Sequence, residues 1–158
     1  MNRPLKLRAE DKDDLQVISG CLQDAIVPIG EMCFLPEEKR FVMVANRFRW
    51  ETITEGEAEA MPLGDASYDG DGDVIPPFER TNCGLCFDGV TAVKVRGLNL
   101  HDRHQMLELL AFEAAADGIV MHFSGGACIK LDGERWICHL QDIGEPWPTS
   151  HRPTHPLD

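Results

Sequence analysis

Residues 32–51, MCFLPEEKRFVMVANRFRWE, decide the fold class. Apolar residues form a short run before Pro36 and return after Lys39 with a period of two, a pattern that is typical of strands. The proline and the charged residues between the two runs favour a turn. The stretch therefore predicts a hairpin, in which a short strand ends at Leu35 and a long strand runs from Arg40 to about Glu51.

Upstream of the hairpin, residues 10–26 (EDKDDLQVISGCLQDAI) predict a helix. Leu15, Ile18, Leu22 and Ala25 recur at spacings of three and four, which places them on one face of a helix. Asp11 stands where an N-cap residue would accept a hydrogen bond from the first turn. Pro28 and Gly30 then end the helical pattern.

Downstream, residues 80–98 predict a second hairpin with Asp88 and Gly89 as its turn, since this dipeptide is a strong signal for a two-residue turn. A strand from about Leu109, a strand over 119–123 and a last strand over 134–143 follow from short apolar runs separated by glycine-rich turns. The sum is an α+β fold, with one N-terminal helix packed on a strongly bent antiparallel sheet or open barrel of about seven strands built from hairpins.

The length of 158 residues predicts a single domain over 1–147. The proline-rich end, 148–158, predicts a disordered tail. No apolar stretch is long enough to cross a bilayer, and no secretory signal is recognisable at the start, so the sequence predicts a cytoplasmic protein without a membrane partner. Cysteines in that compartment stay reduced.

Charge is concentrated in one segment. Nine of the acidic residues lie between Glu51 and Glu79, where there is no Lys or Arg, and the formal net charge of the chain is −12. Residues 65–74, DASYDGDGDV, resemble a calcium loop, but the twelfth position is Pro76 where a bidentate glutamate is required. We therefore expect a mobile acidic loop over 52–79 and no calcium. The overall charge, without a basic stripe, argues against nucleic acid.

The cysteines offer one alternative with a metal. Cys83 and Cys86 precede His101 and His104 by a spacing close to that of a structural zinc site. Against zinc, the intervening residues predict a hairpin with a basic strand, and HDRH (101–104) is more simply a polar loop. A redox pair is disfavoured because positions i and i+3 of a strand point to opposite faces. We expect no metal and no cofactor, with these four residues as the alternative zinc ligands.

Arg47 and Arg49 are the candidate binding residues. They share one face of the predicted long strand, and Arg96 ends a neighbouring predicted strand. Three guanidinium groups that converge could bind a carboxylate or a phosphate. The alternatives are that the arginines form a solvated strand face or that they pair with the acidic segment that follows them.

The helix, the hairpin ending NRFRWE (46–51), the strand LCFDGVTAVKVRGL (85–98) and the closing LQDIGEPW (140–147) resemble a family of short alphaproteobacterial proteins known as domain of unknown function 2948. The resemblance implies no activity, cofactor or catalytic residue. It implies that cysteines are not general at positions 83 and 86, and that the acidic segment varies in length.

Two classes of function stay open. The first is a non-catalytic accessory or binding module that uses a sheet face or edge to contact a protein partner or an anionic small molecule. The second is a small enzyme whose site is assembled from residues on several strands. The sequence favours the first, because no His, Cys or Ser stands in a context that would activate it. The oligomeric state does not follow from the sequence.

Overall fold

The computed structural model of the protein describes residues 4–50, 67–68, 74–75 and 78–149. Within these residues there is one α-helix, and every strand pairing is antiparallel. The elements in chain order are β1 Lys6–Ala9, α1 Lys12–Cys21, β2 Ile26–Pro28, β3 Met32–Leu35, β4 Arg40–Phe48, β5 Ser67–Tyr68, β6 Val74–Ile75, β7 Phe78–Asp88, β8 Ala92–Arg96, β9 Met106–Ala115, β10 Gly118–Phe123, β11 Cys128–Asp132 and β12 Ile137–Thr149. None of the described helices is long and apolar enough to cross a membrane.

The main sheet has ten strands in the order β1-β12-β7-β4-β2-β9-β10-β11-β8, with β3 added beside β4. The prediction of one helix and an antiparallel sheet is confirmed, but about seven strands was too few. β11 was missed because its residues were assigned to a glycine-rich turn, and β1 and β2 were missed because they are only four and three residues long. Such short strands carry too few residues for an alternating pattern to be visible.

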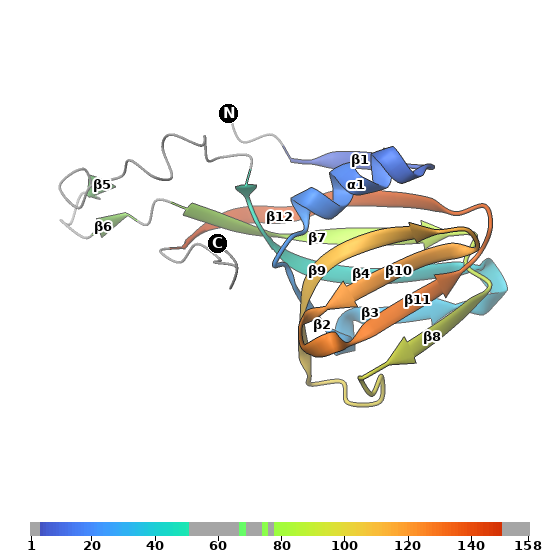
Figure 1. The fold of residues 1–158 in the computed structure, drawn as a ribbon. Coiled ribbons are helices and arrows are strands. Elements are labelled where there is room, and N and C mark those ends of the chain that lie inside the picture. Colours follow the sequence, from blue (N-terminus) through green and yellow to red (C-terminus); the bar gives the residue numbers. More distant parts are fainter. Residues whose placement is uncertain (1–3, 51–66, 69–73, 76–77, 150–158) are drawn as a thin grey trace.

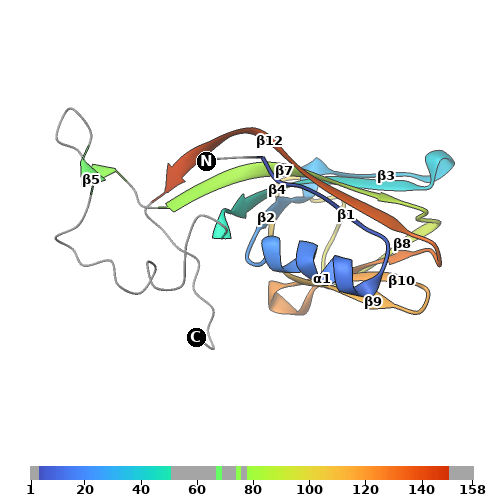
Figure 2. The same cartoon turned by 90° about the horizontal axis from the view of Figure 1, so that it is seen from above.

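The sheet is strongly curved, so strands far apart in its order meet across the core. The rings of Phe87 on β7 and Phe112 on β9 lie 5.6 Å apart at the centroids, although β4 and β2 separate these strands in the sheet. β2 forms the corner, because it pairs with β4 only at Ile26 and with β9 at three positions. The two halves of the sheet thus enclose one apolar core (Figure 2).

The helix fills the opening between β1 and the far part of β9 (Figure 2). Its buried face carries Leu15 and Ile18 into the core. Where β2 no longer pairs with β9, two helix side chains take over. The main-chain N–H of Phe112 donates to the Ser19 hydroxyl at 2.9 Å, and the Gln16 amide donates to the Phe112 carbonyl at 3.2 Å.

The predicted start of the helix is confirmed, since the Asp11 side chain accepts a hydrogen bond from the Asp14 N–H. Its end was predicted too late. The helix stops at Cys21, and Asp24 adopts a left-handed conformation with φ of 64°. This turn frees Ile26–Pro28 to form β2, so the apolar residues at 25 and 26 that extend the helical spacing belong to other structure.

The first predicted hairpin is confirmed as β3 and β4, which pair from Met32↔Met43 to Leu35↔Arg40. The second was wrong, because β7 pairs with β4 and β12, while β8 pairs with β11. The turn at Asp88-Gly89 therefore carries the chain from one half of the sheet to the other. The chain crosses again between β11 and β12, which are also not paired with each other.

Two segments were predicted to be irregular, the acidic segment and the C-terminal tail. In the acidic segment, β5 and β6 form a two-stranded sheet, and Phe78 begins β7. The rest of the segment lies outside the described residues, so its mobility stays a prediction; these residues are 51–66, 69–73 and 76–77. The tail was predicted to begin at 148, but β12 continues to Thr149 after an irregularity in register between Ile143 and Trp147. Residues 150–158 lie outside the description.

Candidate functional site

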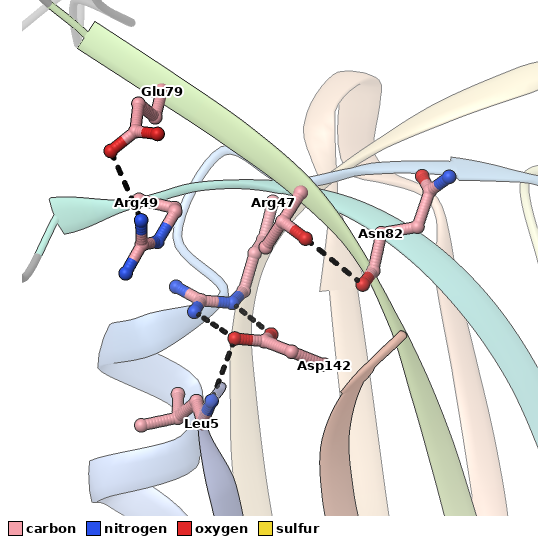
Figure 3. Close-up of polar contacts among 7 residues, drawn as sticks. Leu5, Arg47, Arg49, Glu79, Asn82 and Asp142 are labelled. Atoms are coloured by element: carbon pink, nitrogen blue, oxygen red, sulfur yellow. Dashed lines mark hydrogen bonds and ion pairs between the residues drawn. The ribbon is translucent and has the colours of Figure 1, made fainter. Parts of the chain in front are cut away.

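Arg47 lies inside the protein. Its side chain is fully buried and makes two hydrogen bonds with Asp142 of β12, from Nε at 2.8 Å and from one terminal nitrogen at 2.7 Å (Figure 3). The same carboxylate accepts the N–H of Leu5 at 2.8 Å. A bidentate pair with a third hydrogen bond satisfies most of the capacity of a buried carboxylate. Arg47 therefore fixes strands β4 and β12 and the start of β1.

Arg49 follows the same face and is also buried. One of its terminal nitrogens lies 3.0 Å from the Glu79 carboxylate of β7 (Figure 3). Of the two alternatives for these arginines, the solvated face was wrong, while pairing with the acidic segment is confirmed at Glu79. Alternate residues of β4 face the core, and this alternation continues after Ala45, so Arg47 and Arg49 lie on the core side.

A cavity of about 240 Å³ lies beside Arg49, between β4, β7 and the irregular part of β12. Its lining includes Thr81, Asp142 and Glu145. In the described part of the lining, two carboxylates therefore lie beside one arginine, Arg49, which itself pairs with Glu79. This balance of charge does not favour an anionic ligand over water.

Arg96 does not join the other two arginines. It is exposed on the outer face of β8 beside Lys94 and Lys130, whereas Arg47 and Arg49 are buried on the core side of the sheet. The predicted cluster of three guanidinium groups was therefore wrong. The cause is the misassigned second hairpin, since pairing of β7 with β8 would have brought Arg96 next to β4 through β7.

The alternative zinc ligands are also dispersed. Cys83 faces the core with its side chain fully buried, whereas Cys86 lies on the outer face of β7. His101 and His104 are exposed in the loop after β8. Among the described residues, no group of three or more His, Cys, Asp or Glu is placed to hold a metal ion.

The two thiols are poor nucleophiles in the folded state. Burial raises the pKa of Cys83 to about 12, and the nearby Arg47 charge only partly offsets this effect. The pKa of Cys86 is raised as well, by burial and then by the neighbouring Asp88 carboxylate. A thiolate is the reactive form, so neither residue matches a redox or catalytic cysteine.

The opening that remains lies between β3 and β8 (Figure 1). At one end the sheet nearly closes, because the Lys39 carbonyl accepts the N–H groups of Gly89 and Val90 at 2.8 and 2.9 Å. From there β3 and β8 diverge, and within the described residues β3 pairs only with β4 and β8 only with β11. We call this opening the β3–β8 seam.

The seam contains a cavity of about 430 Å³ with a mainly apolar lining. Six apolar side chains line it: Met32, Phe34, Phe41, Val93, Val95 and Leu100. The other lining residues are Cys33 and Arg103. Arg103 donates from one nitrogen to the carbonyls of Gly30 and Met32 at 2.9 and 3.2 Å, which ties the loop after β8 to β3. Cavities of this size and polarity are typical of ligand sites.

The opposite, outer face of β8 is basic. Lys94 and Arg96 project there beside Lys130 of β11, in the same register. Asp132 pairs with both lysines, and the pKa of its carboxyl lies below the ordinary value because of the hydrogen bond from Lys94. Arg96 is exposed and forms no ion pair with any described residue. The edge strand therefore separates an apolar face from a positively charged one.

The comparison with family models gives a match over residues 5–155 to the family described as "Protein of unknown function (DUF2948)". The chain belongs to this family. A search of the curated proteins found no match to this DUF2948 member, and neither did a search of the solved structures. The family description names no activity.

Sequence reasoning missed the seam and the partner of Arg47. One signal for the seam was present, since Val93 and Val95 alternate with Lys94 and Arg96 as on an edge strand. The pairing of Arg47 with Asp142 had no local signal, because it depends on β7 lying between β4 and β12.

Proposed function

We propose that this protein is a cytosolic binding module that accepts an extended segment of a partner protein in the β3–β8 seam. The observation that carries the proposal is the contrast between the two openings of the sheet. The helix fills the opening between β1 and β9 and supplies hydrogen bonds to the Phe112 main chain. In the β3–β8 seam, by contrast, two edge strands face an apolar cavity.

An extended segment suits the seam for two reasons. The outer edges of β3 and β8 present main-chain N–H and C=O groups, which a strand of a partner can pair with. Its alternate side chains would then enter the apolar cavity, and burial of apolar surface contributes about 25 cal/mol per Å². Both interactions come from one conformation of the ligand, the β-strand.

The lining supports binding more than proton transfer. Among the described residues that line the seam, only Cys33 and Arg103 carry titratable groups, and the Arg103 side chain is engaged with main-chain carbonyls. A catalytic site needs a base or nucleophile with a group that activates it. The cavity beside Arg49 supports an anionic small molecule less well than the seam supports a peptide, because Asp142 and Glu145 line it.

The test uses selected peptides. A library of random displayed peptides is panned against the full chain, and binders are measured by fluorescence anisotropy with the wild type and with Val95→Asp. Val95 is 42% exposed, so the variant should fold. Val95 also lines the seam, so a carboxylate at this position would be buried against an apolar ligand and should weaken its binding. We expect the binders to lose about tenfold in affinity or more.

Val17→Asp is the matched control, since Val17 is 58% exposed on α1, away from the seam. Its melting temperature and that of Val95→Asp show whether either variant is unfolded. Amide hydrogen exchange should slow at 92–96 when a peptide binds, because strand pairing protects the edge. Equal losses in the two variants, or protection at β1 in place of β8, would contradict the proposal.

A further inference from the structure

The charges around β8 define the class of segment that the seam would receive. A strand paired along β8 has two faces, and its side chains alternate between them. One face meets Val93 and Val95 and the apolar cavity, while the other continues the outer face of Lys94 and Arg96. A complementary segment must therefore alternate as well.

The described residues that line the seam contribute one positive charge and no negative charge. No carboxylate lines the seam among the described residues, and Arg103 contributes a guanidinium group whose partners are carbonyls. On the outer face, Asp132 and Asp117 pair with Lys94 and Lys130, which leaves the positive charge of Arg96 as the surplus. This holds although the chain as a whole carries a net charge of −12.

A second copy of the chain is a poor occupant for the same reason. In an antiparallel pair of two β8 strands, Lys94 and Arg96 would face the Lys94 and Arg96 of the other copy. Like charges directly opposite each other across a strand pair are destabilising. Two β8 edges therefore disfavour pairing with each other, and the edge favours a segment that carries negative charge.

We propose that the β3–β8 seam binds extended segments in which apolar residues alternate with Asp or Glu. This inference rests on the proposed function and adds the chemistry of the partner. The apolar residues occupy the cavity between Phe34 and Val95, and the acidic residues lie over Lys94 and Arg96. Electrostatic attraction of this kind raises the association rate and selects between partners.

The other explanation for the basic residues is protection of an exposed edge, because lysine and arginine on edge strands prevent aggregation. The chain provides an internal comparison. β1, the edge at the other end of the sheet, carries Lys6 and Arg8 around Leu7, a pattern that repeats Lys94 and Arg96 around Val95. One difference is that Arg8 already pairs with Glu10 at 2.6 Å. If the basic residues only protect the edges, charge reversal at position 96 should matter no more to an acidic peptide than charge reversal at position 8.

The experiment uses four synthetic peptides of about seven residues, the length of an ordinary strand. The first alternates valine with glutamate, and the second alternates valine with lysine. The third has the composition of the first in two separate blocks, and the fourth is the first with N-methylated main-chain amides. We expect the first peptide to bind the wild type about tenfold more tightly than any of the others.

Charge reversal then locates the site. Arg96→Glu should weaken the valine–glutamate peptide by about tenfold and strengthen the valine–lysine peptide, whereas Arg8→Glu should change neither. Arg96 is exposed, so the fold should tolerate the change, and Arg96→Gln gives the intermediate effect of neutralisation. Raising the salt from about 0.1 M to about 1 M should reduce the difference between the peptides.

Equal binding of the first two peptides by the wild type, or equal effects of the changes at positions 8 and 96, would overturn the inference. So would failure of the valine–glutamate peptide to bind at all. These results leave the proposed function standing if library peptides of another composition still depend on Val95. The proposed function fails separately, when no selected peptide distinguishes Val95→Asp from Val17→Asp.

Discussion

Arg47 and Asp142 are separated by 95 positions in the sequence, yet their side chains form a fully buried bidentate ion pair. The pair spans β7, since Arg47 is level with Thr81 and Asp142 with Cys83 on that strand. It also holds the Leu5 N–H, so that β1 is placed at the edge of β12. This pair is thus part of the framework.

Loss of one partner from this pair should destabilise the fold. Arg47→Met or Asp142→Leu leaves an uncompensated charge in the interior, which costs about 3–5 kcal/mol of unfolding free energy. Urea denaturation of each single variant measures this cost. The double variant Arg47→Met/Asp142→Leu should recover much of the loss, because two apolar side chains replace both charges. A double variant no more stable than the singles would argue against an isolated pair.

The hydrogen bond from Phe112 to Ser19 should matter more than an ordinary surface contact. Ser19→Ala leaves the buried Phe112 N–H without its acceptor, which costs about 1–3 kcal/mol. Thermal and urea unfolding provide the value. Ser124→Ala is the control, because Ser124 is exposed and should change stability by less than about 0.5 kcal/mol. Equal effects at the two serines would show that the helix does not seal the opening in this way.

Local structure was predictable wherever one segment contains its own signal. The Asp11 cap and the β3–β4 hairpin were correct because a capping side chain and a short turn act within a few residues. The strand beginning at Met106 was placed a few residues late, but as a strand it was correct. Element type was therefore accessible for the longer segments.

Pairing was not predictable where the turn joins strands that do not pair. Asp88-Gly89 has the composition of a hairpin turn, yet β8 leaves β7 and pairs with β11. The composition reports the local φ, which is 87° at Gly89, and not the direction that the chain takes afterwards. This error carried over to the candidate site. Arg96 was grouped with Arg47 and Arg49 because β8 was expected to pair with β7, whereas the observed pairing of β8 with β11 leaves the β3–β8 seam open.

The crossing turn should depend on glycine at position 89. A Cβ there would clash with the carbonyl oxygen of Arg135, in addition to the cost of the positive φ. We expect Gly89→Ala to lower the free energy of unfolding by more than about 2 kcal/mol. Gly125→Ala separates the two effects, because Gly125 also has a positive φ of 79° but open space around it, so about 1 kcal/mol is expected. Similar losses at 89 and 125 would remove the steric argument.

Alkaline pH should destabilise the protein through its buried thiols. The pKa of Cys83 is about 12 in the folded state because of burial, against an ordinary value of 9.0. Above pH 9.0 the unfolded thiol loses its proton while the folded one keeps it. The free energy of unfolding should therefore fall by about 1.4 kcal/mol per pH unit for this thiol.

Cys83→Ala should reduce this slope, measured by urea denaturation between about pH 9 and about pH 10, below the titration of most lysines. Its absolute stability will also change, so the slope is the quantity to compare. Cys33→Ala is the control, because Cys33 is exposed. A slope that responds to Cys33 and not to Cys83 would refute the assignment.

Cys33 should report on occupation of the seam. Cys33 is exposed and belongs to β3, one of the two strands that border the seam, whereas Cys83 and Cys138 are buried, and the pKa of the Cys138 thiol is raised by burial. Alkylation by iodoacetamide should therefore modify Cys33 first, as followed by peptide mass spectrometry, since reaction requires access and a thiolate. The valine–glutamate peptide should slow modification of Cys33 and leave Cys86 unchanged, because Cys86 lies on the outer face of β7. Protection of Cys86 without protection of Cys33 would place the peptide on the outer face of β4, β7 and β12, and would contradict binding in the seam.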